Sequence, residues 1–148
     1  MKTPSGLSRI SRVFALLTAA IAAGCANPRE DVRLTLCKDM VAVELGAMPA
    51  WQGSAIQTHG YRGAVVTVRY ATADGEQRAD CFYRYDAPDD TALTLANPIE
   101  AYATSPSKMI LDGRTLAGPE LARAVKRALE RQGRAFVERA RQALQGGQ

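Results

Sequence analysis

Residues 65–85, "VVTVRYATADGEQRADCFYRY", decide the fold of this chain. Two runs rich in β-branched and aromatic residues flank Asp74-Gly75. An Asp-Gly pair between such runs is typical of a tight turn that joins antiparallel strands. The pattern therefore predicts a β-hairpin, with its strands within residues 61–72 and 76–87.

The second strand of this hairpin has two different faces, because successive side chains along a strand point to opposite sides. One face carries Ala79, Cys81, Tyr83 and Tyr85, and the other carries Asp80, Phe82 and Arg84. If Cys81 meets a cysteine of a preceding helix, the first set packs on that helix. Phe82 then needs cover on the opposite face, for which the C-terminal helix is the candidate.

A helix is expected before the hairpin, from Asn27-Pro28-Arg29-Glu30 to Gly46. Asn27 can cap the first turn, and proline suits the first helical position. Glycine suits the left-handed conformation in which helices often end. The apolar face recurs at helical spacing through Leu34, Cys37, Val41 and Leu45.

The segments between these elements have weaker patterns. Residues 47–55 are expected to be a loop that carries Trp51, the single tryptophan. Within residues 91–107, two runs have the character of strands, "TALTLA" and "IEAYA". Residues 109–116, "MILDGRTL", again place Asp-Gly between apolar residues, which predicts a tight turn or small hairpin.

The clearest element is a long C-terminal helix that begins at Gly118-Pro119-Glu120 and extends towards Leu144. Its apolar stripe comprises Leu121, Val125, Leu129, Phe136, Ala140 and Leu144. A polar face carries Arg123, Arg127, Arg131, Arg134 and Arg141. This face is either simply solvated or a binding surface for an anionic partner, such as lipid headgroups, lipopolysaccharide or an acidic protein.

These elements place the chain in the α+β class. We expect an N-terminal helix packed on a small antiparallel sheet of about three strands, followed by the long amphipathic helix. Residues 25–148 are long enough to form one domain with its own core.

The first residues have the pattern of an export signal. Lys2, Arg9 and Arg12 precede an apolar run at residues 13–23, and no acidic residue occurs before Glu30. The run is too short to cross a bilayer as a stable helix, which needs about 20 apolar residues. A signal peptide explains it better.

The sequence Ala22-Ala23-Gly24-Cys25 resembles the lipobox of bacterial lipoproteins, although the usual leucine is replaced by Ala22. The resemblance covers residues 1–26. It implies that residues 1–24 are removed and that Cys25 receives a diacylglycerol and an N-acyl chain. Ala26, where an aspartate favours retention in the inner membrane, implies the periplasmic face of the outer membrane. The alternative is an ordinary signal peptide with a chance cysteine.

Charge argues against a nucleic-acid partner. Three of the 19 basic residues lie in the expected signal peptide and none of the 15 acidic residues do, so the mature chain is nearly neutral. If Cys25 carries lipid, Cys37 and Cys81 remain as a pair. An oxidising periplasm favours a disulfide between them. The alternatives are two buried free thiols or, less compatible with the spacing, a redox pair.

No pattern of catalytic or metal-ligating residues is found. His59 is the single histidine, which is too few for a zinc site, and no G-x-S-x-G elbow occurs. The acidic turn at residues 86–90 lacks the ligand spacing of a calcium loop. No catalytic residue, metal ligand or cofactor is therefore assigned.

The function that we expect is a membrane-anchored envelope lipoprotein, a non-catalytic component that binds an envelope protein or a surface. Residues 30–86 also loosely resemble small bacterial envelope proteins of a helix-plus-hairpin type, in which a helix cysteine and a strand cysteine are bonded. One alternative is a periplasmic inhibitor or small-ligand-binding module that uses Trp51, His59 and Tyr61. A hydrolase with distant converging aspartates is another.

Overall fold

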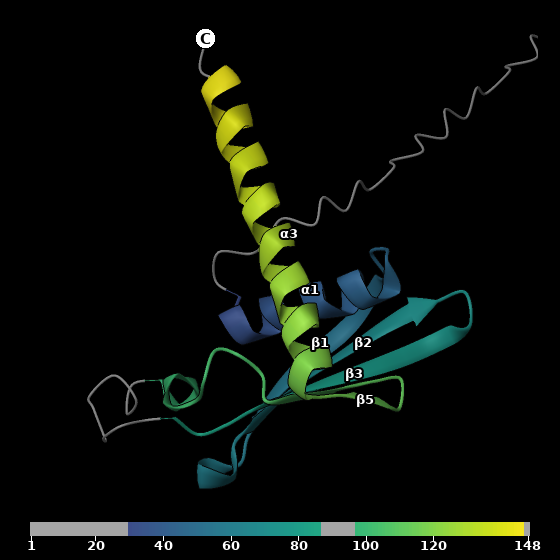
Figure 1. Ribbon diagram of the computed structural model, residues 1–148, viewed down its shortest axis with the longest axis vertical. Helices are drawn as coiled ribbons and strands as arrows, with labels where there is room; N and C mark the ends of the chain where they lie inside the picture. The colour runs from purple at the N-terminus through teal and green to yellow at the C-terminus, as the bar shows by residue number, and fades with distance from the viewer. Residues whose placement is uncertain (1–29, 87–96, 147–148) are drawn as a thin grey trace, which may run out of the picture.

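The computed structural model describes residues 30–86 and 97–146, and in them two α-helices lie on one face of a five-stranded antiparallel sheet (Figure 1). The elements in chain order are α1 (Val32–Leu45), β1 (Ala50–Thr58), the 3-10 turn η1 (Gly60–Arg62), β2 (Ala64–Thr72), β3 (Gly75–Tyr83), the 3-10 turn η2 (Pro98–Ala101), β4 (Lys108–Leu111), β5 (Arg114–Leu116) and α3 (Gly118–Gln145). The α+β class is confirmed. The expected sheet of about three strands is wrong, because the sheet has five strands in the order β1-β2-β3-β4-β5.

The central hairpin forms as the sequence predicts. β2 and β3 pair from Ala64↔Tyr83 to Thr72↔Gly75, and Gly75 takes the positive φ of 115° that the turn requires. Ala79, Cys81 and Tyr83 are buried on the face that carries the helices. The predicted alternation of the second strand is therefore confirmed.

The disulfide between Cys37 of α1 and Cys81 of β3 is present, with an S–S distance of 2.07 Å. Both cysteines are fully buried. Since β3 is the middle strand of the sheet, the bond joins the helical layer to the centre of the core. Around it pack Met40, Val66, Val68, Tyr70 and Met109.

The start of α1 differs from the prediction. Asn27 lies outside the described residues, and the helix is capped instead by Asp31, whose Oδ1 accepts a hydrogen bond of 2.8 Å from the amide of Arg33. An aspartate is as good a cap as an asparagine, so the cap can lie four residues later than expected. The end of the helix at Gly46 is confirmed, with a left-handed φ of 70°.

The predicted loop at residues 47–55 is wrong, because its second half belongs to β1. This strand lies at the edge of the sheet and pairs only with β2. It has few β-branched residues, and its register shifts between Trp51 and Gly53, so it lacks the alternating pattern that would have revealed it. Trp51 packs edge-on against Tyr70, with ring centroids 6.0 Å apart.

Two further segments test the weaker predictions. The hairpin at residues 109–116 is confirmed, since β4 and β5 pair around Asp112 and Gly113, which both have positive φ. The strand expected from "IEAYA" is wrong. Its first residues form η2, with Pro98 in the first turn, and Tyr102 makes an isolated bridge to Tyr85. The run at residues 91–96 lies outside the described residues.

The C-terminal helix does not cover Phe82, which corrects another expectation. α3 packs across α1 on the buried face of the sheet (Figure 1). On the opposite face, the Lys108 ammonium lies 4.1 Å from the centre of the Phe82 ring. Asp80 accepts hydrogen bonds from Thr67 and Arg78 on the same side of the sheet. This face is therefore covered by polar and cationic side chains rather than by a helix.

A buried arginine fixes the beginning of α1 against the rest of the fold. The Arg33 guanidinium donates to the carbonyl of Ala103 at 3.0 Å and to the carbonyl of Tyr102, and it pairs with Asp31 at 3.2 Å. The Arg33 carbonyl accepts from the Tyr83 hydroxyl at 2.9 Å. Residue 33 thus joins α1, β3 and the segment after η2, a role that its sequence context does not reveal.

Candidate functional site

The C-terminal part of α3 projects beyond the sheet and the other helix (Figure 1). A helix of 28 residues is about 42 Å long, and only its N-terminal part packs on the rest of the fold. Leu121, Ala124 and Ala128 are buried, whereas every described residue from Gly133 to Gly146 is exposed. We call residues 129–145 the distal segment of α3.

Ion pairs and a hydrogen bond join α3 to α1 around the start of the distal segment. Asp39 of α1 accepts from Arg131 Nε at 3.1 Å and from Gln132 Nε2 at 2.8 Å. Glu44, nearer the end of α1, pairs with Arg127 and with Arg114 of β5. The hydrogen bond with Glu44 raises the pKa of Arg114, so this group stays cationic. These contacts set the angle at which the distal segment projects.

The five arginines of the predicted surface therefore divide into three groups. Arg127 and Arg131 make ion pairs with α1. Arg141 lies 3.4 Å from Glu138 on the same helix. Within the described part of the chain, Arg123 and Arg134 have no ion-pair or hydrogen-bond partner. Arg139, which the sequence-based list omitted, also projects from the distal segment without a partner there.

The distal segment exposes large apolar side chains as well as arginines. The exposed fractions are 52% for Leu129, 66% for Phe136, 53% for Val137 and 81% for Leu144. An isolated exposed leucine is common on protein surfaces, but a row of such residues along one helix usually marks a site of contact. The segment is thus a candidate binding surface.

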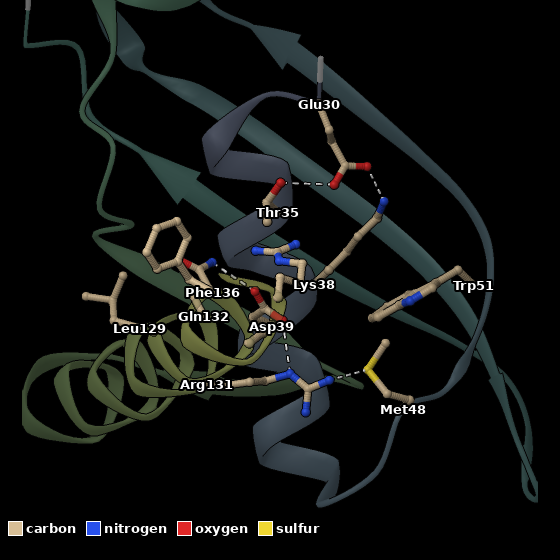
Figure 2. A pocket seen from close by; sticks show the side chains of 13 residues that line it. Glu30, Thr35, Lys38, Asp39, Met48, Trp51, Leu129, Arg131, Gln132 and Phe136 are labelled. Carbon is tan, nitrogen blue, oxygen red and sulfur yellow. Dashed lines mark hydrogen bonds and ion pairs between the residues drawn. The ribbon is translucent and has the colours of Figure 1, made fainter. Parts of the chain in front are cut away.

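A groove of about 660 Å³ lies beneath the first turns of the distal segment. Figure 2 shows Leu129 and Phe136 on its α3 side, Met48 and Trp51 on the opposite side, and Asp39 of α1 between them. Arg131 reaches across the groove to Met48, with Nη2 2.8 Å from Sδ. Met48 and Trp51 belong to the segment that enters β1, so the missed strand forms one wall of the groove.

Charges along the floor of the groove are internally paired. Glu30 accepts from the Thr35 hydroxyl at 3.0 Å and from Lys38 (Figure 2). Asp39 is occupied by Arg131 and Gln132, as described above. Arg139, which also lines the groove, has no ion-pair or hydrogen-bond partner among the described residues. The groove therefore combines large apolar side chains with charges that are mostly paired.

The residues of the alternative ligand site do not come together. Trp51 lines the groove near one end of β1, whereas His59 and Tyr61 follow the other end, about 25 Å away at the rise of a strand. The Tyr61 side chain is exposed and its ring lies 4.8 Å from that of Tyr85. A single site containing Trp51, His59 and Tyr61 is therefore not formed.

Within residues 30–86 and 97–146, no three of the residues His, Cys, Asp and Glu are grouped so that they could hold a metal ion. Across those ranges, no helix is both long enough and apolar enough to cross a membrane. Cys25, the expected lipidation site, lies outside the described residues, as does most of the acidic turn at residues 86–90.

In comparisons with known proteins, no family model, curated protein or solved structure matches this chain.

Proposed function

We propose that this protein is a lipid-anchored component of the bacterial envelope that acts by binding, with the distal segment of α3 as its binding surface. Cys25 is the site of lipid attachment, and residues 1–24 are the signal peptide that is removed. The acyl chains, palmitate among them, hold the domain on the periplasmic face of the outer membrane. The candidate partners are the bilayer surface and an unidentified envelope protein.

The observation that carries this proposal is the exposure of the distal segment. It presents Phe136, Val137 and Leu144 to solvent, together with Arg134 and Arg139, which have no ion-pair or hydrogen-bond partner among the described residues. A helix of this kind needs a partner to cover its apolar side, since every described residue from Gly133 onward is exposed. The resemblance to a lipobox at Cys25 supports the proposed location of the protein at the membrane.

Lipid attachment is tested by growing cells that express the full chain with an alkyne-tagged fatty acid. We expect label on the wild-type protein and none on Cys25→Ala, with the protein in the outer-membrane fraction of a density gradient. Cys37→Ala with Cys81→Ala is the matched control, because it removes two cysteines but keeps Cys25. Equal labelling of wild type and Cys25→Ala would contradict the lipid anchor.

The binding surface is tested by placing a photo-crosslinking amino acid at Phe136 or, as a control, at Tyr61. Both positions are highly exposed, but Tyr61 lies on η1 rather than on the distal segment. We expect irradiation of intact cells to give defined protein or lipid adducts at position 136 and far fewer at position 61. Equal or absent adducts at position 136 would exclude the distal segment as the binding surface.

A small-ligand-binding module remains a second candidate because of the groove beside Trp51. Its volume of about 660 Å³ is in the range of small-molecule sites, and four large apolar side chains line it. Native mass spectrometry of protein purified without denaturant tests this function. A retained small molecule that is lost in Trp51→Ala would favour it over the binding surface on α3.

A further inference from the structure

We propose that the distal segment of α3 lies flat in the interface of an anionic bilayer, the same membrane in which the lipid on Cys25 is embedded. This inference rests on the proposed function, because it takes Cys25 as the lipid anchor. It commits to lipid, rather than a protein, as the partner of the exposed helix.

The arrangement of side chains on the distal segment is that of an in-plane membrane helix. Its large apolar residues and Ala140 lie within about 100° of the helix circumference, at about 100° per residue: Leu129, Phe136, Val137, Ala140 and Leu144. Arg139 borders this arc on one side and Arg141 on the other. In an interfacial helix, arginines in these border positions extend their charged ends to the headgroups while the apolar residues enter the acyl region.

The charge of the segment favours lipid over a second copy of the chain. Residues 129–145 contain four arginines and two glutamates. Two such segments packed together would bring unpaired arginines close to one another. Anionic headgroups are instead complementary to Arg134 and Arg139, which have no partner in the described residues.

The position of the segment fits an anchor on Cys25. Glu30 lines the same groove as Phe136 and Arg139, so the first described residue lies beside the distal segment. Glu30 lies five positions after Cys25, and an extended chain spans at most about 3.6 Å per residue, which gives about 18 Å. A lipid at Cys25 therefore brings the membrane surface within reach of α3. Because the anchor already holds the domain there, weak insertion is sufficient.

The test uses the full chain produced in bacteria, purified from their membranes in detergent and reconstituted into vesicles of phosphatidylethanolamine and phosphatidylglycerol. In a Trp51→Phe background, Phe136→Trp provides a fluorescent probe on the distal segment, and Tyr61→Trp provides a matched probe on η1. Lipids brominated on their acyl chains quench tryptophan that enters the hydrocarbon region. We expect a blue-shifted emission and strong quenching for the position 136 probe, and neither change for the position 61 probe.

The arginines are tested in the same vesicles. Each arginine near an anionic surface changes the balance of inserted to free segment by about fivefold, so Arg134→Gln with Arg139→Gln should cause a clear loss of quenching. Arg62→Gln, an exposed arginine on η1, is the charge-matched control and should cause no change. Replacing phosphatidylglycerol with phosphatidylcholine should act like the double variant.

The outcomes separate this inference from the proposed function. If the chain fails to float with the vesicles, the lipid anchor and this inference both fail. If it floats and the position 136 probe is quenched no more than the position 61 probe, the anchor stands and the in-plane helix is excluded. If the position 136 probe is protected from brominated lipid while crosslinking yields dimers of the chain, a second copy covers the helix, and the inference is overturned.

Discussion

Arg131 of α3 lies 3.1 Å from Asp39 of α1, measured from Nε to Oδ1, at the last turn where the two helices touch. Beyond this contact, α3 continues for more than three turns with every side chain exposed. The pair therefore marks the boundary between the part of α3 that builds the fold and the part that is available to a partner. It also shows that an arginine on an exposed helix face can have a structural role.

Removal of the carboxylate at this boundary should weaken the fold slightly. Asp39→Ala deprives Arg131 and Gln132 of their acceptor, and we expect the free energy of unfolding to fall by about 0.5–1 kcal/mol, because the pair is partly exposed. Urea denaturation measures the change. Glu76→Ala removes an equal charge from an exposed position of β3 that makes no ion pair with the described residues, and it should have a smaller effect. An equal loss in both variants would show that the contact with α3 contributes nothing.

Loss of the disulfide should be much more costly. Cys37 and Cys81 are separated by 44 positions, and closing a loop of this size stabilises by about 4 kcal/mol in the chain-entropy model. We expect Cys37→Ala with Cys81→Ala to lower the free energy of unfolding by about that amount in urea denaturation. Alanine side chains are small enough to fit the buried site without strain. A loss of less than about 1 kcal/mol in the free energy of unfolding would contradict a structural role for the bond.

The Arg33 side chain is buried, and replacing Arg33 tests how much its hydrogen bonds and ion pair contribute to stability. Arg33→Met removes the donors to the Ala103 and Tyr102 carbonyls and leaves Asp31 without its partner. We expect a loss of about 3–5 kcal/mol in the free energy of unfolding, as when one partner of a buried pair is removed. Arg62→Met, at an exposed position of η1, is the control and should change stability by less than about 0.5 kcal/mol.

Alkaline pH should destabilise the protein through two buried tyrosines. Burial raises the pKa of Tyr83, and burial together with the hydrogen bond to Asp112 raises the pKa of Tyr70. Above the unperturbed tyrosine pKa of about 10, the unfolded chain loses protons that the folded chain retains. The contribution of these two tyrosines to the free energy of unfolding is therefore constant below that pH and falls as pH rises beyond it.

Urea denaturation between pH 8 and pH 11, values chosen to bracket the unperturbed tyrosine pKa of about 10, measures this slope. Tyr70→Phe should reduce it, because the proton-binding difference at that residue disappears. Tyr61→Phe, which changes an exposed ring, should leave the slope unaltered. A slope that is the same in wild type and Tyr70→Phe would show that Tyr70 titrates alike in both states.

The sequence revealed the elements that carry strong local patterns. The hairpin around Asp74-Gly75 alternates clearly, and Cys37 lies on the apolar face of a helix. The packing of α1 on β3 through the bond between Cys37 and Cys81 was therefore predictable. Trp51 was misplaced because β1 is an edge strand with a bulge, and half-exposed edge strands do not need regular alternation. The cap of α1 was placed too early because Asn27 and Asp31 are chemically equivalent as caps.

The candidate site depends on contacts between distant parts of the chain, which local patterns do not contain. The amphipathic character of α3 could be read from Leu129, Phe136 and Leu144. That Arg131 pairs with Asp39, while Arg134 has no partner in the described residues, depends on where α3 crosses α1. The groove likewise needs Trp51 and Phe136, from segments far apart in sequence, to line the same space.

The most direct test of the lipid-anchored placement is the intact mass of the native protein extracted from bacterial membranes. We expect a chain that begins at Cys25, carries the added mass of its acyl groups and lacks the thiol hydrogens of Cys37 and Cys81. A product that retains residues 1–24, carries no acyl mass and has three free thiols would contradict both the anchor and the periplasmic location.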